Sequence, residues 1–264
     1  MFTGIVEARG TVERLEADGA VCRVVIATPA DFPVEALPLG ASIAVDGVCL
    51  TVTGRAPGWF SADLGPETLA LTTLGALAPQ AQVHLERPLK LGDALGGHLV
   101  SGHVDGVGRV VARQEKGDAL ELHIEAPLTV APTLVVKGSI TVDGVSLTIN
   151  AVEGKRFSVT LIPHTLAVTH LGARPPGAAV NLEADLIAKH IDRLVAARFS
   201  ATATSTPTPT PADSDRFRPL ASASASPSAS SPEPRPDLAP RSTSAGLTLE
   251  TLSRHGFIKH GPAR

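Results

Sequence analysis

The sequence has few aromatic residues and few cysteines, and neither sign of charge dominates. It contains no tyrosine, one tryptophan and two cysteines in 264 residues, and its formal net charge is −3. A near-neutral chain lacks the basic footprint of proteins that bind nucleic acid or anionic membranes, and the shortage of aromatic rings removes the usual stacking platforms for bases. Two cysteines do not form a disulfide framework, so the sequence favours a reduced, cytoplasmic protein.

Long apolar runs are also missing. No stretch approaches the roughly 20 apolar residues that a membrane-spanning helix requires. The first residues, MFTGIVEARG, lack the charged-then-apolar pattern of a signal peptide. Glycine-rich phosphate loops of the Walker or dinucleotide type are absent as well. These absences favour a protein that stays in the cell and does not hold a nucleotide through those motifs.

What the sequence does contain is a tandem duplication. A shift of 97 residues, without a gap, aligns residues 42–86 with residues 139–183 and leaves 24 of 45 positions identical. The stretch SIAVDGVCLT, which begins at Ser42, returns as SITVDGVSLT, which begins at Ser139. Between the copies lies a bridge, residues 87–100, that mixes glycine with apolar residues and leads into the motif GGHLVSGH. Function should therefore be read from what each copy keeps and what it changes.

Each copy has the pattern of a small β-barrel. Short runs rich in β-branched residues, partly alternating with polar ones, predict strands. In the first copy these runs are residues 4–15, 21–28, 42–52, 59–64 and 83–89, and in the second they are residues 102–111, 120–127, 137–149, 156–162 and 179–186. Asp46-Gly47 and Asp143-Gly144 are strong signals for tight turns. Many short strands with glycine and proline between them indicate a closed barrel, and residues 66–69 indicate a short helical turn.

The character of the chain changes after the second copy. Apolar residues at helical spacing, among them Ile187, Ile191 and Leu194, predict an amphipathic helix over residues 185–199. Its apolar stripe must pack either on a barrel or on other copies of the chain. From residue 200 the composition falls to alanine, serine, threonine and proline, which predicts a disordered tail over residues 200–264. The last residues could form a short terminal helix that docks elsewhere, but a frayed end is the commoner case.

Chemistry is expected where the two copies differ. Cys49 becomes Ser146, Ile5 becomes His103, Gly40 becomes Lys137 and Glu67 becomes His164. Each has an ordinary alternative: Cys49 could be a small buried hydrophobe, and His103 a structural residue. His98 and His103 resemble a metal pair only weakly, because no third ligand is evident. Ser146 and Thr148 alternate on one strand face, as do Cys49 and Thr51, and such a polar face most often meets solvent.

Taken together, the motifs resemble riboflavin synthase of the α-chain type. They are MFTGIV at the start, DGVCLTV, ETLxxTxLG, GGHLVSGHVDG, KGSITVDGVSLT, IPHTL and VNLEAD, in that order. The resemblance covers about residues 1–197. It implies a mostly β protein with two homologous six-stranded Greek-key barrels, over residues 1–97 and 98–184. It also implies that the helix over residues 185–199 holds a homotrimer together.

The resemblance also implies a reaction and its partners. Two molecules of 6,7-dimethyl-8-ribityllumazine would exchange a four-carbon unit and give riboflavin and 5-amino-6-ribitylamino-uracil. No metal or organic cofactor is expected, and the active site would lie between the first barrel of one subunit and the second barrel of its neighbour. Lumazine synthase is the further partner that the resemblance raises, and the sequence leaves that docking open. The alternative function is a non-catalytic lumazine- or flavin-binding protein of the antenna type, and a purely structural module is the third.

Site residues follow from the motifs position by position. The first pocket is expected to contain Gly4, Ile5, Val6, Cys49, Leu50, Thr51, Asp63, Leu64, Gly65, Pro66, Glu67 and Thr68. The second is expected to contain Gly102, His103, Val104, Ser146, Leu147, Thr148, Ile162, Pro163, His164, Thr165, Leu166 and Ala167, with Lys137 reaching the neighbouring subunit's ligand. The family motif has glutamate where this chain has His164, so a carboxylate contact is in question there.

Catalytic roles are expected for Cys49, His103, Ser146 and Thr148. One lumazine must lose a proton from its 7-methyl group, and His103 or the hydroxyls of Ser146 and Thr148 could assist. The other needs a nucleophile at ring carbon 7, which could be Cys49, a hydroxyl or water. Holding two flat reactants face to face is worth about 7–11 kcal/mol by itself, so positioning is expected to supply most of the catalysis.

Overall fold

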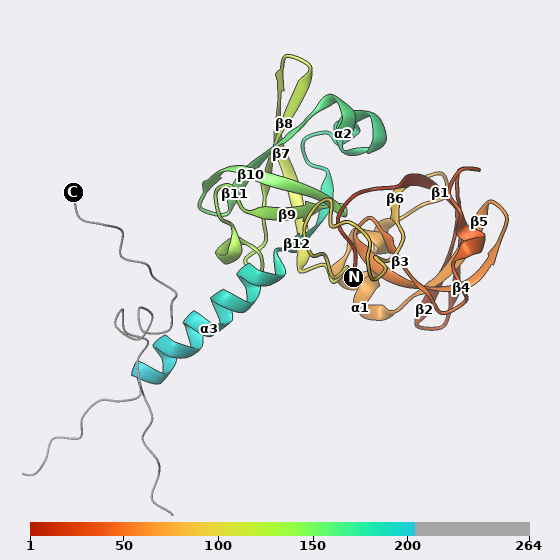
Figure 1. Cartoon of the computed structure of the whole chain (residues 1–264), viewed down its shortest axis with the longest axis horizontal. Coiled ribbons are helices and arrows are strands. Elements are labelled where there is room, and N and C mark those ends of the chain that lie inside the picture. Colours follow the sequence, from red (N-terminus) through yellow and green to blue (C-terminus); the bar gives the residue numbers. More distant parts are fainter. Residues whose placement is uncertain (204–264) are drawn as a thin grey trace, which may run out of the picture. The chain divides into compact units, whose positions relative to one another are not determined.

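The computed structural model describes residues 1–203 of the chain (Figure 1). It contains two closed barrels of six antiparallel strands each. The first consists of β1 (Ala8–Asp18), β2 (Val21–Ala27), β3 (Ser42–Val45), β4 (Val48–Ala56), β5 (Trp59–Leu64) and β6 (Gln82–Glu86). The second consists of β7 (Gly106–Lys116), β8 (Ala119–Glu125), β9 (Ser139–Val142), β10 (Val145–Glu153), β11 (Arg156–Leu161) and β12 (Ala179–Ala184). The predicted pair of barrels is confirmed.

Both barrels use the same strand order. The first runs β1-β2-β5-β4-β3-β6 around the ring, and the second repeats this order with each strand number raised by six. The last strand of each copy closes the ring: β6 pairs with β1 and β3, and β12 pairs with β7 and β9. Because β2 pairs with β5 rather than with β3, the connections form a Greek key.

Two tight turns set the register of the strands that carry the predicted site. Asp46 and Gly47 have φ angles of 44° and 79°, and Asp143 and Gly144 have φ angles of 47° and 80°. Two successive positive φ angles define a type I′ hairpin, whose twist matches that of the flanking strands. The hairpin pairs Val45 with Val48, and since side chains alternate along a strand, neighbouring residues of β4 face opposite sides.

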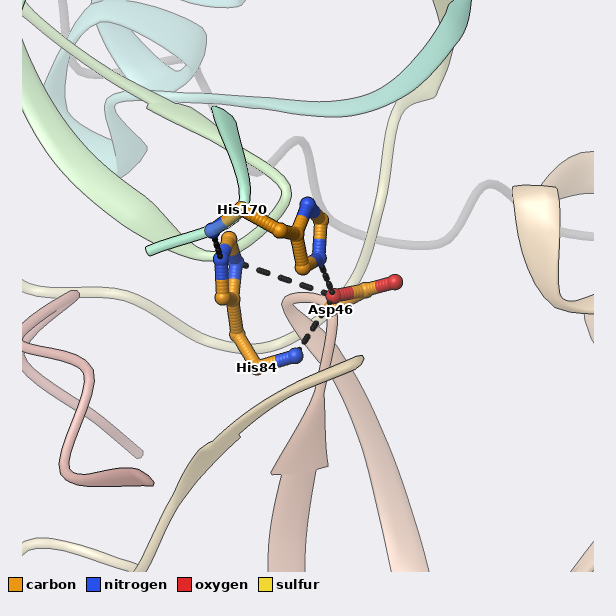
Figure 2. A group of neighbouring side chains, drawn as sticks. All are labelled: Asp46, His84 and His170. Carbon is orange, nitrogen blue, oxygen red and sulfur yellow. Dashed lines mark hydrogen bonds and ion pairs between the residues drawn. The ribbon is translucent and has the colours of Figure 1, made fainter. Parts of the chain in front are cut away.

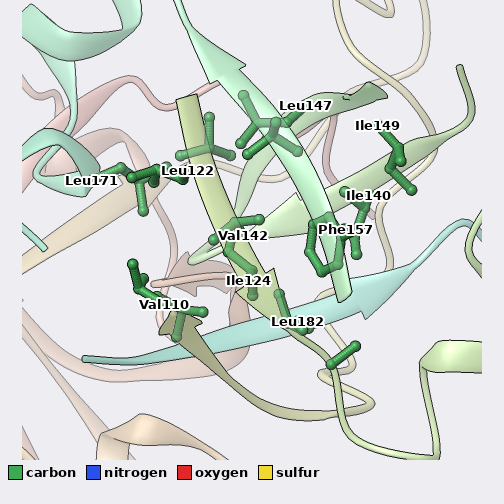
Figure 3. Close-up of a cluster of buried hydrophobic side chains, with 14 of the residues drawn as sticks. Val110, Leu122, Ile124, Ile140, Val142, Leu147, Ile149, Phe157, Leu171 and Leu182 are labelled. Carbon is green, nitrogen blue, oxygen red and sulfur yellow. The ribbon is translucent and has the colours of Figure 1, made fainter. Parts of the chain in front are cut away.

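Each barrel has its own apolar core, and the two cores are built alike. Phe60 in β5 and Phe157 in β11 occupy equivalent positions and are 0% and 2% exposed. Figure 3 shows the second core, to which Leu122, Ile140 and Phe157 contribute from three different strands. The inward-facing residues are the apolar members of the alternating pattern, which is why the sequence could indicate them.

The strands expected to begin at Gly4 and Gly102 begin later. Strand β1 starts at Ala8 and β7 at Gly106, so the first four residues of each expected strand lie outside the barrel sheets. The segment before each strand instead pairs with its counterpart. Phe2 and Val100 form an isolated antiparallel bridge, with N–O distances of 2.7 and 3.1 Å. The expectation is wrong here because β propensity does not say which partner a segment pairs with.

Helices are few in the described part of the chain. The short helices α1 (Pro66–Leu71) and α2 (Pro163–Val168) follow β5 and β11, and α1 confirms the predicted helical turn. Helix α3 (Leu186–Ala203) follows β12, and its Ile187, Ile191 and Leu194 are all more than half exposed. None of the described helices is long and apolar enough to cross a bilayer. Helix α3 continues to Ala203, so residues 200–203, predicted as the start of the tail, are helical; the rest of the predicted tail and its terminal helix lie outside the described residues.

Candidate active site

The polar face predicted from the repeat lies on the outside of each barrel. In the first barrel Ser42 pairs with Thr51 and Ala44 with Cys49, so these four side chains share one face of the sheet. In the second barrel Ser139 pairs with Thr148, and Thr141 pairs with Ser146. We call the group Ser42, Cys49 and Thr51 the first site, and the group Ser139, Ser146 and Thr148 the second site.

Three predicted site residues contribute no side chain to these faces. Leu50, Leu64 and Leu147 belong to the barrel cores and are 4%, 0% and 9% exposed. Their side chains alternate with those of the site residues and therefore point inward. At the outer face only the backbone of these leucines is present, and their place among the binding residues stays a prediction.

Each site is completed by a segment that belongs to the other barrel's copy. The Cys49 N–H donates to the carbonyl of Gly102 at 2.8 Å, and the Ser146 N–H donates to the carbonyl of Gly4 at 2.7 Å. Val104 packs on the first core and Val6 on the second. The segments on either side of the Phe2–Val100 bridge are thus exchanged between the barrels.

This exchange corrects the assignment made from the motifs. Gly4 and Val6 were expected in the first pocket, and Gly102 and Val104 in the second, but each pair lies against the opposite barrel. Ile5, between them, lines a cavity on the first barrel. Sequence similarity groups a segment with its own copy, and only long-range contacts show where the segment packs.

Glycine is required at both crossing points. Gly4 has a φ of +75° and Gly102 a φ of +80°. A Cβ atom on Gly4 would lie 2.6 Å from the Ser146 Cβ, and one on Gly102 would lie 2.6 Å from the Cys49 Cβ. Both the backbone conformation and the available space therefore exclude a side chain. The Gly4 segment therefore lies directly against Ser146 and the Gly102 segment directly against Cys49, one of the positions at which the two copies differ.

The sequence did not identify His98 as a partner of Ser146. The His98 Nδ1 lies 2.7 Å from the Ser146 Oγ, and the His98 N–H donates to the Thr3 carbonyl at 3.1 Å. Burial lowers the pKa of His98, and in the neutral tautomer that carries its proton on Nε2 the ring accepts a hydrogen bond from the Ser146 hydroxyl. In the sequence, His98 stood only as half of a weak metal pair with His103. The exposed His103 makes a single described contact, from its N–H to the Ser101 Oγ at 3.2 Å.

The remaining predicted residues lie in β5, in α1 and α2, or just before these helices. Asp63 is held by Arg23 at 2.7 and 3.1 Å on the outer face of β2 and β5, and this contact lowers the pKa of Asp63. Glu67 and His164 are exposed at equivalent positions of α1 and α2. The neighbouring positions Gly65, Pro66, Thr68, Ile162, Pro163, Thr165, Leu166 and Ala167 are partly or fully exposed around them. No described contact links any of these residues to Cys49 or Ser146.

Lys137 is exposed and adopts a left-handed backbone conformation. Its φ is +67°, where the first barrel has Gly40 at +85°. A lysine in this region costs roughly 1–2 kcal/mol relative to extended backbone. Lys137 therefore occupies a backbone conformation that favours glycine, and its expected contact with a neighbouring subunit's ligand stays a prediction.

Equivalent cavities adjoin the two sites. A cavity of about 570 Å³ is lined by Ser42, Ile5 and Lys90 among others, and a cavity of about 410 Å³ by Ser139, Ile187 and Ile191 among others. Residues 42, 90 and 94 of the first correspond to residues 139, 187 and 191 of the second at the repeat shift of 97. Both volumes fall within the range of about 300–1,000 Å³ that is usual for small-molecule sites.

A buried polar cluster joins the barrels. Asp46, His84 and His170 lie within 4.8 Å of one another and form the only group of metal-ligand type within residues 1–203 (Figure 2). The rings of His84 and His170 stack with centroids 3.7 Å apart. Burial lowers the pKa of both histidines to about 4, so both are neutral near pH 7.

The hydrogen bonds show that this cluster is structural rather than a metal site. The backbone N–H of His170 donates to the ring Nε2 of His84 at 2.9 Å. The ring proton of His84 is therefore on Nδ1, which donates to the backbone carbonyl of Asp143 at 2.8 Å. His84 therefore has no lone pair left for an ion. Asn181, at the equivalent position, donates to the Asp46 carbonyl and accepts from the Thr73 N–H. We call Asp46, His84, Asp143, His170, Arg174 and Asn181 the inter-barrel cluster.

Arg174 balances the acidic groups of the inter-barrel cluster. Its guanidinium contacts the Asp143 carboxylate at 2.9 Å and approaches Asp46 at 3.9 Å. Burial raises the pKa of Asp143 to about 6, and the charge of Asp46 adds to this rise. The cluster fixes both Asp-Gly turns, because Asp46 accepts the His84 N–H and Asp143 accepts the Asn181 N–H, each at 2.7 Å. The inter-barrel cluster thereby fixes the starting positions of β4 and β10, the strands that carry Cys49 and Ser146.

Comparison with known proteins finds relatives that share both repeats. The family model of the lumazine binding domain matches residues 3–88 and again residues 101–185. Riboflavin synthase of Mycobacterium bovis is 47% identical over 199 residues, which cover 74% of this chain and 98% of the relative. Riboflavin synthase of Brucella abortus is 43% identical over 201 residues, with the same coverage. The structure of LumP complexed with riboflavin matches with a TM-score of 0.65 and 26% identity, over 70% of this chain and 99% of LumP.

Proposed function

This chain belongs to the riboflavin synthase family, and on that premise we propose that it transfers a four-carbon unit between two molecules of 6,7-dimethyl-8-ribityllumazine. One molecule becomes riboflavin and the other becomes 5-amino-6-ribitylamino-uracil, which makes the protein a transferase. The observation that carries this proposal is the match of both repeats to the lumazine binding domain, together with identities of 43–47% over 98% of two riboflavin synthases.

The two sites are suited to different halves of this reaction. At the first site, Cys49, a hydroxyl or water adds to ring carbon 7 of one lumazine, while Thr51 and Ser42 offer hydroxyls on the same face. At the second site, Ser146 and Thr148 assist removal of a proton from the 7-methyl group of the other. The exposed His103 is the alternative base, and Lys137 approaches the ligand of a neighbouring subunit.

The contact between His98 and Ser146 supports this division. With neutral His98 accepting its proton, the Ser146 hydroxyl has a more basic oxygen and a fixed orientation. Cys49, at the equivalent position, shows no described hydrogen bond of its thiol. The second site therefore suits proton transfer better than the first, whereas a thiol is the better nucleophile.

We further propose that the chain works as a homotrimer held by α3. The exposed Ile187, Ile191 and Leu194 form an apolar face that a second copy can cover, and the cavity of about 410 Å³ lies between this helix and the second barrel. An exposed stripe of this kind marks an association surface. A trimer would bring the first site of one subunit to the second site of its neighbour. Sedimentation of Leu194→Glu as a monomer would support this assignment, and an unchanged trimer would contradict it.

A cytoplasmic location is proposed from the cysteines. Cys22 and Cys49 are both free in the structure. Free thiols persist in reducing compartments, where disulfides are rare. Fractionation of cells that express the full chain would test this location.

Turnover of the purified full chain tests the proposed reaction. With 6,7-dimethyl-8-ribityllumazine as the sole substrate and no added metal, the amount of riboflavin formed, followed by its absorbance, should reach half the molar amount of lumazine consumed. Thr51→Val and Thr148→Val should each lower turnover. Thr53→Val, the same change two residues further along β4 and outside both sites, should leave turnover unchanged. Tight binding of lumazine without riboflavin would contradict the proposal and favour a binding protein of the LumP kind.

The binding-protein alternative rests on a weaker similarity than the enzyme does. LumP is 25–26% identical to this chain, whereas the riboflavin synthases above reach 43–47%. Both copies here keep the polar pair on the outer strand face, Cys49 with Thr51 and Ser146 with Thr148. Two equipped sites are what a reaction between two identical substrates requires, so the enzyme is the better-supported function.

A further inference from the structure

Two buried glutamates hold the exchanged segments. Neither is a member of the first or second site, although Glu86 lines the cavity of about 570 Å³ that adjoins the first site. Glu183, in β12 of the second barrel, is 2% exposed. Its Oε1 accepts the Ser101 N–H at 2.8 Å and the Ser101 hydroxyl at 2.6 Å, and its Oε2 accepts the Gly102 N–H at 2.9 Å. Three donors on consecutive groups of one segment make this side chain a clamp on residues 101 and 102.

Glu86, in β6 of the first barrel, repeats this arrangement at the equivalent position. It is 6% exposed. Its Oε1 accepts the Thr3 N–H at 2.6 Å and the Thr3 hydroxyl at 2.7 Å, and its Oε2 accepts the Gly4 N–H at 3.1 Å. The two clamps are the same device built twice, which makes each a matched control for the other.

The clamped segments lie against the opposite barrel. Gly102, held by Glu183, offers its carbonyl to the Cys49 N–H of the first site. Gly4, held by Glu86, offers its carbonyl to the Ser146 N–H of the second site. One glycine residue therefore lies between each carboxylate and the Cys49 or Ser146 backbone of the opposite barrel.

A buried carboxylate is costly unless it is well bonded, and here the donors are aimed at it. Burial raises the pKa of both glutamates, while the bonds from Thr3, Gly4, Ser101 and Gly102 oppose that rise. Hydrogen bonds to a charged acceptor are shorter and roughly twice as strong as neutral ones. A carboxylate with three such bonds holds the segment in one position, which an apolar contact would not do.

We propose that Glu183 is a positioning residue for the first site and that Glu86 is a positioning residue for the second site. Each glutamate belongs to one barrel and acts on the site of the other, through the segment that it clamps. The consequence for lumazine binding rests on the proposed function, but the crossed positioning itself does not. The ordinary alternative is that both glutamates only stabilise the fold, in which case loosening either one affects both sites alike.

Amide hydrogen exchange of the full-length protein without ligand distinguishes these possibilities. In Glu183→Gln, the amide group faces the Gly102 N–H with a donor in place of an acceptor, which removes one bond and opposes two donors. We expect exchange at the Cys49 amide to accelerate at least tenfold while the Ser146 amide changes less than twofold. Glu86→Gln should give the reverse pattern. Equal acceleration at both amides in either variant, or acceleration only in the glutamate's own barrel, overturns the proposal.

A chemical readout checks the first site independently. In a Cys22→Ser background, Cys49 is the single remaining thiol of the chain. Its alkylation by iodoacetamide should be at least fivefold faster in Glu183→Gln and within twofold of the parent in Glu86→Gln, and equal rates in the two variants would refute the crossed assignment. If either glutamine variant fails to fold, Ser101→Ala and Thr3→Val each delete one clamp bond and should give the same crossed pattern at smaller amplitude.

Neither readout needs substrate, so the result stands apart from the reaction. Crossed exchange without riboflavin formation would keep the positioning role and remove the proposed function. Normal turnover with uncrossed exchange would keep the function and remove the positioning role.

Discussion

A single methyl group at residue 102 should disrupt the first site. Gly102 has a φ of +80°, and an alanine Cβ there would lie 2.6 Å from the Cys49 Cβ, 2.9 Å from the Phe2 ring and 3.0 Å from the Cys49 nitrogen. The left-handed backbone costs an alanine roughly 1–2 kcal/mol. Overpacking against a closed contact adds about 1–3 kcal/mol, because Cys49 is held in β4 and cannot move away freely. Gly102→Ala should therefore lose about 2–5 kcal/mol of unfolding free energy.

Gly117 provides the matched control for this substitution. It has a φ of +62° in the turn between β7 and β8, and no atom lies within 4 Å of its Cβ position. Gly117→Ala should therefore lose only the backbone contribution of about 1–2 kcal/mol. Urea unfolding at pH 7 gives both values, with equal slopes as the check that the unfolded states are comparable. Equal losses in the two variants would show that the contact with Cys49 does not constrain the segment, and would refute the reasoning.

Three further predictions follow from the other contacts. Cys49→Ser abolishes riboflavin formation if the thiol adds to the ring, whereas near-normal turnover in the lumazine assay would eliminate covalent addition by sulfur. His98→Gln should lower turnover about 10- to 100-fold and flatten its pH profile, since the amide cannot accept and release a proton as the ring can, and an unchanged profile would remove His98 from proton transfer. His84→Asn copies the bonds that Asn181 makes at the equivalent position, so stability at pH 7 should change by less than about 2 kcal/mol. Because the pKa of His84 is lowered from 6.5 to about 4, the stability that the neutral ring contributes to the parent protein is lost as pH falls from 6.5 to 4. Urea unfolding at each pH should show that His84→Asn loses about 3 kcal/mol less unfolding free energy than the parent over that range. An identical loss in both proteins would contradict the neutral state of His84.

Local patterns were sufficient for most of the fold. The run WFSADL was predicted as a strand and forms β5 over the same residues, and the Asp-Gly pairs form the expected tight turns. These features depend on alternation over a few residues and on turns that favour a positive φ, which are properties of the local sequence. The duplication also made the second barrel predictable from the first.

The polar faces of the sites were predictable for the same reason. Cys49 and Thr51 lie on one face because side chains alternate along β4, and the core position of Leu50 follows from that rule too. The sequence could not show which segment lies beside Cys49. That segment contains Gly102 and is separated from Cys49 by 53 positions in the chain, and nothing in its composition distinguishes packing on one barrel from packing on the other.

The buried polar contacts were equally out of reach. His98 and Ser146 are 48 positions apart, and His84 and His170 are 86 apart, so neither pair forms a motif that spacing could indicate. In the sequence, Glu86 and Glu183 are distinguished only as identical residues at equivalent positions of the two copies. Their partners are backbone N–H groups, and every residue except proline carries one, so no pattern of side chains marks them.

The sequence by itself determined the duplication, the barrel type of each copy, the turn positions and the polar strand faces, because these depend on residues that are neighbours in the chain. Only the tertiary structure decided against which barrel each exchanged segment packs, which hydroxyl His98 contacts and how the inter-barrel cluster is protonated. Those outcomes depend on contacts between residues tens of positions apart and on burial, which changes the pKa of a histidine or a carboxyl group without changing the sequence around it.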